Sequence, residues 1–161
     1  MKVYIGSDHA GFALKAALIP YIRELGYTVE DCGAHLLDTE DDYPKVIRLA
    51  LLKLTDDLRE DTNSRAIVIG GSGQGEAMVA NRFKGVRCAL FYGGAKTQVD
   101  TTGNELDIVG STRVHNDANA LSIGARFVTQ DEAKDAVKKW LETPFSKETR
   151  HVRRVWQIDE S

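Results

Sequence analysis

The chain has 161 residues, of which 42% are hydrophobic and 28% are charged, and its formal net charge is −3. This length and composition are typical of one globular domain with a sizeable core, so we predict a single domain over residues 1–161. The small negative charge excludes a general attraction to nucleic acid or to an anionic membrane surface.

The two cysteines, Cys32 and Cys88, lie far apart in the sequence and form no CxxC motif. We interpret both as core or near-core thiols in a reducing compartment. The N-terminus lacks the charged region and long apolar run of a signal peptide, and no stretch reaches the length of a membrane helix. We therefore expect a cytoplasmic protein.

In chain order, the first predicted strand covers Lys2 to Gly6 and leads into a polar loop, residues 7–11. A helix follows, because apolar residues recur at helical spacing from Phe12 to Leu25. Proline lacks an amide hydrogen, so Pro20 predicts a kink or a division of this helix. Gly26 is a candidate C-cap.

The second predicted strand covers Tyr27 to Asp31, and a polar run from Asp38 to Asp42 follows it. The next helix should begin at Tyr43-Pro44, because the missing amide hydrogen of proline would have no partner in a first turn. We expect this helix to extend through Leu58. Its apolar stripe, which should face the core, consists of Ile47, Leu51, Leu54 and Leu58.

The centre of the sequence is the stretch from Ala66 to Glu76, in which a β-branched run precedes four glycines in six residues and then a carboxylate. The run predicts a buried parallel strand, and the apolar spacing of residues 77–83 predicts a helix. Glycines at a strand end let a ligand approach the main chain, and amide hydrogens at a helix start favour an anion. The loop should therefore bind a negatively charged group.

Two known glycine-rich loops do not fit this stretch. A P-loop requires Gly-Lys-Ser/Thr, but Glu76 follows Gly75 where the lysine should be. A dinucleotide loop requires G-x-G-x-x-G, but counted from Gly71 the last glycine is again replaced by Glu76. A carboxylate would repel a polyphosphate, whereas beside a carbon acid it can remove a proton while loop amides stabilise the oxyanion. This combination favours enolisation. A structural turn with Glu76 as a first-turn helix acid is the open alternative.

The second half of the chain begins with a predicted strand, Val86 to Phe91. Residues 92–104 show no clear period and predict a loop or a short surface helix. A polar segment, His115 to Asn119, precedes the fifth predicted strand, Ala120 to Gly124, and Arg126 follows that strand directly.

A capping box at residues 129–132 predicts the start of the next helix. Five strands that alternate with helices, without an internal repeat, predict an α/β fold: a doubly wound (Rossmann-like) five-stranded parallel sheet with a protruding C-terminal helix. Sites in such folds lie at the carboxyl ends of the strands. Asp8, Glu76 and Arg126 follow the first, third and fifth strands, and we expect the loop that carries His115 to fold over them.

The tail, residues 146–158, predicts a basic C-terminal helix. Arg150 and Arg154 lie one turn apart on one face, and Val152 and Trp156 lie on the other. Two guanidinium groups on one face are suited to bidentate contacts with a phosphate. A solvated basic helix without a ligand is the open alternative.

Five motifs in order resemble the type B ribose-5-phosphate isomerases, which belong with the galactose-6-phosphate isomerase subunits, and the resemblance covers nearly the whole chain. They are Gly6 to Phe12, Asp42-Tyr43-Pro44, Gly70 to Glu76 with Ala80-Asn81, His115 to Asn119, and Arg150 to Arg154. The resemblance implies aldose–ketose isomerisation of a sugar phosphate through a cis-enediolate, without metal or other cofactor. Family members use as base either a cysteine at the position of Gly70 or a glutamate at that of Glu76, so this chain resembles the glutamate branch.

The resemblance also implies roles for individual residues. Glu76 would move a proton between C2 and C1, and His115 would open the sugar ring. The enediolate oxygen would be held by Ser72 and the amides of Gly71, Gly73 and Gly75. The sugar and its phosphate would be bound by Asp8, His9, Tyr43, Asn116, Arg126, Arg150 and Arg154. The segment from Gly93 to Asn104 is longer than in the family pattern, which leaves the length of the sugar open.

Three hypotheses compete with interconversion of ribose 5-phosphate and ribulose 5-phosphate. An isomerase of a six-carbon sugar phosphate, of the galactose-6-phosphate or allose-6-phosphate type, would share every catalytic residue. A non-catalytic flavodoxin-like phosphate-binding module would not need Glu76, and a structural subunit of a hetero-oligomer would not need the full set of polar groups.

We expect neither nucleic acid nor a membrane as partner. The expected assembly is a homodimer, or a dimer of dimers, with shared active sites. In this assembly, Arg150 and Arg154 would contribute to the active site at the Glu76 loop of a partner chain. His115 is a further candidate to contribute to the partner's site.

Overall fold

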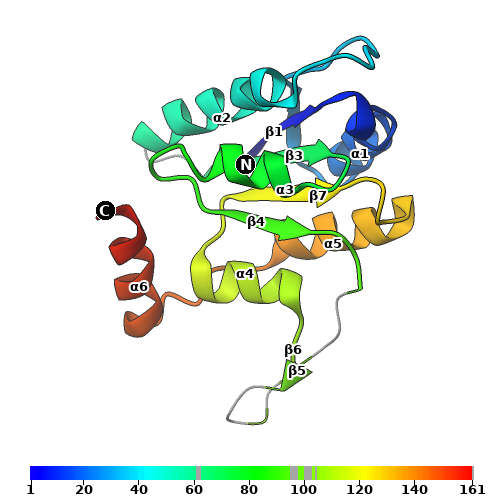
Figure 1. Ribbon diagram of the computed structural model, residues 1–161. Helices are drawn as coiled ribbons and strands as arrows, with labels where there is room; N and C mark the ends of the chain where they lie inside the picture. Colours follow the sequence, from blue (N-terminus) through cyan, green and yellow to red (C-terminus); the bar gives the residue numbers. More distant parts are fainter. Residues whose placement is uncertain (61–62, 95–97, 100–102, 104, 161) are drawn as a thin grey trace.

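The computed structural model describes residues 1–60, 63–94, 98–99, 103 and 105–160. A five-stranded parallel sheet forms its centre (Figure 1), as predicted. The strands are β1 (Lys2–Ser7), β2 (Thr28–Asp31), β3 (Arg65–Gly70), β4 (Cys88–Phe91) and β7 (Ala120–Gly124). Their order in space is β2-β1-β3-β7-β4, and β4 begins at Cys88 rather than at the predicted Val86.

Helices cover both faces of the sheet (Figure 1). They are α1 (Phe12–Glu24), α2 (Tyr43–Arg59), α3 (Gln74–Ala80), α4 (Ile108–Asn116), α5 (Gln130–Glu142) and α6 (Thr149–Asp159). Helices α1 and α5 share a core with Ile67 and Ile69 of β3. Helices α2 and α3 share a second core with Ala66 and Val68. Because β3 is buried on both faces, every residue of its apolar run faces a core.

Helix α1 continues through Pro20, so the predicted division of this helix is wrong. Leu18 and Ile22, on either side of Pro20, are fully buried, and their packing offsets the hydrogen bond that proline removes. The C-cap of the helix is Leu25 rather than the predicted Gly26, which follows it with a φ of 90°.

Helix α2 follows its prediction closely. It begins at Tyr43 and has Pro44 in its first turn. The stripe residues Ile47, Leu51 and Leu54 are fully buried. Because the stripe recurs at helical spacing, it turns one continuous face of α2 toward the sheet.

The segment predicted as a loop or short helix, residues 92–104, lies partly outside the described residues. Within the described part, β5 (Gln98–Val99) pairs antiparallel with β6 (Glu105–Leu106), so the prediction is wrong there. The pairing joins residues inside the segment to residues just after it, and no local period signals such a contact.

His115 and Asn116 form the end of helix α4, so their predicted position in a loop is wrong. The helix is started by Asp107, whose side chain accepts a hydrogen bond from the amide of Gly110 at 2.8 Å. A helix that ends just before β7 holds its last turn beside the start of that strand, so His115 cannot fold over the carboxyl end of the sheet.

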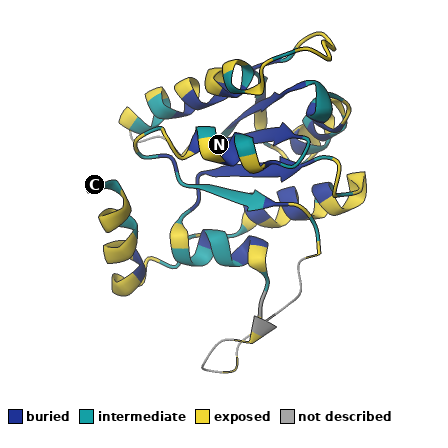
Figure 2. Cartoon of the chain, in the orientation of Figure 1, coloured by how far each residue is buried: buried dark blue, intermediate teal, exposed yellow. Residues whose placement is uncertain are grey.

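Helix α6 protrudes from the domain, as predicted, and most of its residues are exposed (Figure 2). Its buried residue is His151, and the helix packs beside α4. Near its end, Asp159 accepts a hydrogen bond from the amide of Gly85 at 3.2 Å. Of the described helices, none has the length and apolar character needed to cross a membrane.

Candidate active site

The glycine loop, residues 70–75, connects β3 to α3 at the carboxyl end of the sheet (Figure 1). The amide of Arg126 donates to the Gly71 carbonyl at 3.0 Å, and Ser122 Oγ donates to the Gly73 carbonyl at 2.6 Å. Gly73 has a φ of 74°, and a Cβ there would lie 3.0 Å from the backbone of β7. The loop is therefore held tightly against the end of β7, in a shape that needs glycine.

Glu76, in the first turn of α3, directs its carboxylate back over Gly70. A Cβ at Gly70 would overlap this carboxylate, so the absence of a side chain at position 70 creates its space. Glu76 is only 4% exposed, and burial, with a smaller contribution from the charge of Asp8, raises the pKa of its carboxyl group. A helix acid that merely favours the first turn has no need of burial, so this geometry supports a base rather than the structural alternative.

Asp8 reaches the same edge of the sheet from β1. Its amide donates to the carbonyl of Ile69 at 3.2 Å, and its Oδ1 accepts from the amide of Gly11 at 3.0 Å. The side chain is buried. A Cβ at Gly11 would lie 2.6 Å from the Ile69 carbonyl oxygen, so glycine is required where the loop after β1 passes the end of β3.

His9 is held by Asp41, a residue that stands out in the sequence only as part of a polar run. The ring nitrogen Nδ1 of His9 lies 2.6 Å from Asp41 Oδ1, and the His9 amide donates to Asp41 Oδ2 at 3.0 Å. The hydrogen bond to Asp41 raises the pKa of His9, whereas the positive charge of Arg126 acts in the opposite direction. Asp41 is thus a site residue that no local signal identified, because its partner is 32 positions away.

Tyr43 and Arg126 border the glycine loop. A Cβ at Gly75 would lie 2.7 Å from the Tyr43 hydroxyl, so the tyrosine ring packs directly on the loop. The guanidinium of Arg126 lies close to Gly71 in the same way. Ser72 lies in the same loop and is half-buried. The structure therefore gathers the candidates predicted after β1 and β3, together with Arg126, at one edge.

Neither cysteine is suited to act as a base there. Burial raises the pKa of Cys32 to about 11 and that of Cys88 to about 12, so both thiols remain protonated at neutral pH. Cys32 is buried and Cys88 partly buried, consistent with the prediction of core or near-core thiols.

Four predicted site residues lie at the other end of the sheet, beside the starts of the strands (Figure 1). They are His115 and Asn116 at the end of α4, and Arg150 and Arg154 on α6. The Arg87 side chain, just before β4, donates to the Asn116 carbonyl at 3.1 Å. Within one chain, these four predicted site residues therefore do not meet Glu76. Residues just before a parallel strand lie at its amino end, which is why the expectation that the His115 segment folds over the loop is wrong.

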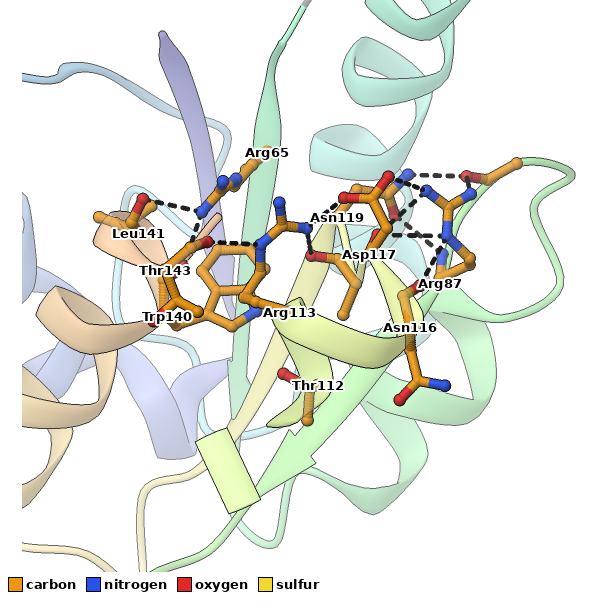
Figure 3. Close-up of polar contacts among 12 residues, drawn as sticks. Arg65, Arg87, Thr112, Arg113, Asn116, Asp117, Asn119, Trp140, Leu141 and Thr143 are labelled. Atoms are coloured by element: carbon orange, nitrogen blue, oxygen red, sulfur yellow. Dashed lines mark hydrogen bonds and ion pairs between the residues drawn. The ribbon is translucent and has the colours of Figure 1, made fainter. Parts of the chain in front are cut away.

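A buried network of arginines fixes the end of α4 (Figure 3). Arg113 donates to Asp117 Oδ1 at 2.8 Å and to the Ala118 carbonyl at 2.6 Å, and Arg87 reaches the other oxygen of Asp117 at 3.1 Å. Arg65 donates to main-chain carbonyls at the end of α5, and its burial, with the nearby charge of Arg113, lowers its pKa to about 10. The network gives the last turn of α4, and hence His115, a fixed position.

His115 packs against His151 of α6, with ring centroids 4.7 Å apart. His115 Nδ1 lies 3.2 Å from Ser111 Oγ, and His151 Nδ1 lies 2.7 Å from Ser146 Oγ. Burial, followed by nearby positive groups, lowers the pKa of His151, although Glu148 opposes this shift. The His151 ring thus packs against the His115 ring where burial disfavours its charged form.

The fold and the carboxyl end of its sheet define an α/β protein with a buried carboxylate beside a glycine loop. A sequence model of the ribose/galactose isomerase family matches residues 3–158. The chain belongs to this family, which confirms the resemblance and the predicted isomerase class. Ribose-5-phosphate isomerase B of Mycolicibacterium paratuberculosis is 39% identical over 96% of this chain and 87% of that protein.

Solved structures match over nearly the whole of both chains. Ribose-5-phosphate isomerase B from Mycoplasma genitalium, with bound ribulose-5-phosphate, matches with a TM-score of 0.83 and 32% identity over 98% of this chain and 93% of that chain. The enzyme of the same name from Clostridium thermocellum matches with a TM-score of 0.82 and 34% identity over 99% and 96%.

Proposed function

We propose that this chain interconverts ribose 5-phosphate and ribulose 5-phosphate. The observation that carries the proposal is the buried Glu76 carboxylate above Gly70, beside the amides of the glycine loop, in a member of the ribose/galactose isomerase family. The relatives named above support the pentose phosphate as substrate.

In the proposed mechanism, Glu76 removes the proton from C2 of the open-chain aldose. The C–H electron pair forms the C1–C2 double bond, and the aldehyde oxygen becomes the anionic oxygen of a cis-enediolate. Glu76 then returns the proton to C1, and the proton of the C2 hydroxyl passes to the neighbouring anionic oxygen on C1. A ketone thus forms at C2 and a hydroxyl group at C1. Burial supports this role, because a carboxylate with a raised pKa is a stronger base than an exposed one.

The developing negative charge would be stabilised by hydrogen-bond donors of the loop. These donors are Ser72 and the amides of Gly71, Gly73 and Gly75. Preorganised amides of this kind act most strongly where water is excluded, and the bracing of the loop by β7 supports their fixed position. We propose on this ground that the chain needs no metal ion for the proton transfer.

Asp8, His9, Tyr43 and Arg126 are the proposed binding residues of the same chain. Asp8 is buried next to Glu76 and is suited to accept hydrogen bonds from sugar hydroxyls. His9 and Arg126 bring positive charge to the same edge, where a phosphate group would be attracted.

We propose that the site is completed by a second copy of the chain. Ring opening by His115, and phosphate binding by Asn116, Arg150 and Arg154, require these groups to reach a Glu76 loop that they do not reach in their own chain. The surface around α3 and β4 supports an interface, because β4 is one of the two edge strands of the described sheet and borders an open cleft of about 640 Å³. The residues that line this cleft are Gln74, Ala77, Met78, Asn81, Arg82, Leu90 and Tyr92.

Exposed apolar side chains support the same assembly. Met78 and Tyr92 are 66% and 55% exposed beside the cleft, and Trp156 of α6 is 63% exposed. Apolar surface of this kind is covered at interfaces. A dimer that brings α6 of one chain to the glycine loop of the other would bury it.

The proposal is tested by a coupled assay on ribose 5-phosphate, allose 6-phosphate and galactose 6-phosphate, with exchange of the C2 proton into deuterated water as a second readout. Turnover of ribose 5-phosphate is the expected result. Turnover of a hexose phosphate alone would establish the six-carbon alternative. If no sugar phosphate is turned over and none exchanges its proton, the chain is a non-catalytic module or a structural subunit.

A further inference from the structure

The contact between His9 and Asp41 does more than connect the short 3-10 helix after β1, His9–Gly11, to the loop before α2. One carboxylate holds the histidine at two points, since Oδ2 accepts the main-chain amide and Oδ1 lies 2.6 Å from ring nitrogen Nδ1. The Asp41 side chain is 10% exposed and that of His9 is 29% exposed. The hydrogen bond from the main-chain amide sets the position of the residue, and the hydrogen bond at Nδ1 sets the rotation of the imidazole ring.

The hydrogen bond at Nδ1 also determines which ring nitrogen can contact a substrate. An ionised carboxylate only accepts hydrogen bonds, so Nδ1 must carry a proton where it faces Asp41. With Nδ1 occupied, a bound molecule can reach only Nε2. If Nε2 is also protonated, the ring is a cation and Nε2 donates a charge-assisted hydrogen bond.

The charged groups that face His9 come from three elements. Asp8 precedes it in its own loop, Asp41 lies in the loop before α2, and Arg126 follows β7. Both carboxylates favour the cationic ring and Arg126 opposes it, with the hydrogen bond to Asp41 as the largest contribution. Removal of Asp41 would therefore leave His9 between one negative and one positive neighbour.

We propose that Asp41 is a positioning residue that holds His9 as a cation with Nε2–H presented to an anionic oxygen of the bound sugar phosphate. The inference rests on the proposed function, because it assigns His9 a contact with that substrate. Asp41 itself acts through His9, and the proton transfer at C2 remains with Glu76.

The test uses Asp41→Asn, which is nearly isosteric. Asn Oδ1 can still accept the His9 amide, and Asn Nδ2 can donate to Nδ1 of a neutral ring, so Nε2 keeps its hydrogen and only the charge is lost. Asp42→Asn is the matched control. It removes the same charge from the adjacent position, where an exposed Asp42 contacts Lys45 at 2.7 Å.

KM and kcat for ribose 5-phosphate are measured from pH 5.5 to 9. In Asp41→Asn, the rise of KM with pH should move to lower pH, because His9 loses its proton earlier. Between the two titration points KM should exceed the wild-type value by about five- to tenfold, the difference between a charged and a neutral hydrogen bond. We expect kcat to change by less than about twofold, because Glu76 is untouched, and Asp42→Asn should follow the wild-type profile.

Titration of the histidine rings by ¹H–¹⁵N NMR gives a readout that is independent of activity. The His9 signals are assigned by their loss in His9→Asn. In the wild-type chain His9 should titrate above about 6.5, the ordinary value, and in Asp41→Asn it should titrate lower. A wild-type His9 that titrates at or below 6.5 would overturn the inference, even if the variant does not fold.

The remaining outcomes separate the inference from the function on which it rests. A KM increase of equal size at every pH, or one that Asp42→Asn shares, would show that Asp41 only stabilises the local structure and does not set the charge of His9. Either result would overturn the inference. An inactive wild-type chain would overturn the proposed function and with it the substrate contact, whereas an active chain with an unchanged Asp41→Asn profile would overturn the inference alone.

Discussion

Replacement of Gly70 by alanine would take away the space in which the Glu76 carboxylate lies. The added Cβ would overlap Cδ and both oxygens of that side chain. Gly70 is not among the residues with positive φ, so β3 itself accepts an alanine without backbone strain. Because the carboxylate is the end of a flexible side chain, we expect Glu76 to rotate away rather than the strand to shift.

The expected loss is large in activity and small in stability. A displaced general base costs about 10²–10⁴ in turnover. Overpacking costs roughly 1–3 kcal/mol when a core cannot relax, but here the side chain can move, and its transfer toward water also removes the cost of burial. For a chain of this size 1 kcal/mol corresponds to about 2–4 °C, so we expect Tm to remain within about 4 °C of the wild-type value.

The assay combines the coupled turnover of ribose 5-phosphate with thermal unfolding. Gly6→Ala in β1 is the control, because its Cβ would meet Ala50 at an ordinary 3.5 Å. The double variant Gly70→Ala/Glu76→Gln should lose little more activity than Glu76→Gln, since both changes remove the same base. Wild-type turnover in Gly70→Ala, or fully additive losses in the double variant, would refute the reasoning.

Four further predictions follow from the site. Glu76→Gln keeps the shape of the side chain but not its basic oxygen, so C2 proton exchange into deuterated water should fall by about 10²–10⁴ at near-normal affinity; exchange at the wild-type rate would assign the base elsewhere. Because burial raises the folded pKa of Glu76, its contribution to stability is full below the unfolded pKa and is lost as pH rises through the folded value. Glu76→Gln should therefore have a higher Tm than wild type at pH 7 and lose this advantage at pH 4, and an equal difference at both would contradict the burial argument. Arg154→Ala should raise KM and weaken inhibition by inorganic phosphate, and subunit exchange with Glu76→Gln should restore activity, because one shared site then carries neither lesion; verified exchange without recovery would show that each chain builds its own site. Turnover should survive EDTA, since loop amides can stabilise the enediolate; a loss that a divalent ion reverses would show that a metal takes part.

The elements could be predicted because their signals are local. The apolar run of β3, the stripe of α2 and the capping box at the start of α5 each lie within a few residues, and the structure contains all three. The glycine loop and Glu76 belong to the same class of signal, since a strand end, a loop and a helix start adjoin in the sequence. Their chemistry could therefore be inferred before any contact was known.

Other features depend on contacts that no pattern in the sequence indicates. The contact of His9 with Asp41, the overlap of the Gly70 position with the Glu76 carboxylate, and the pairing of β5 with β6 have no periodic signature. The continuity of α1 through Pro20 likewise depends on the buried neighbours of the proline rather than on the proline itself.

By itself, the sequence determined the parallel α/β fold and the acid at the end of the third strand, because hydrophobic period and glycine placement act over short distances. Only the tertiary structure decided which candidates meet. The order β2-β1-β3-β7-β4 brings Asp8, Glu76 and Arg126 to one edge, and the entry of the chain into β7 leaves His115 at the other. The physical reason is that strand order is set by the packing of helices on both faces of the sheet, a property of the whole chain that no local window contains.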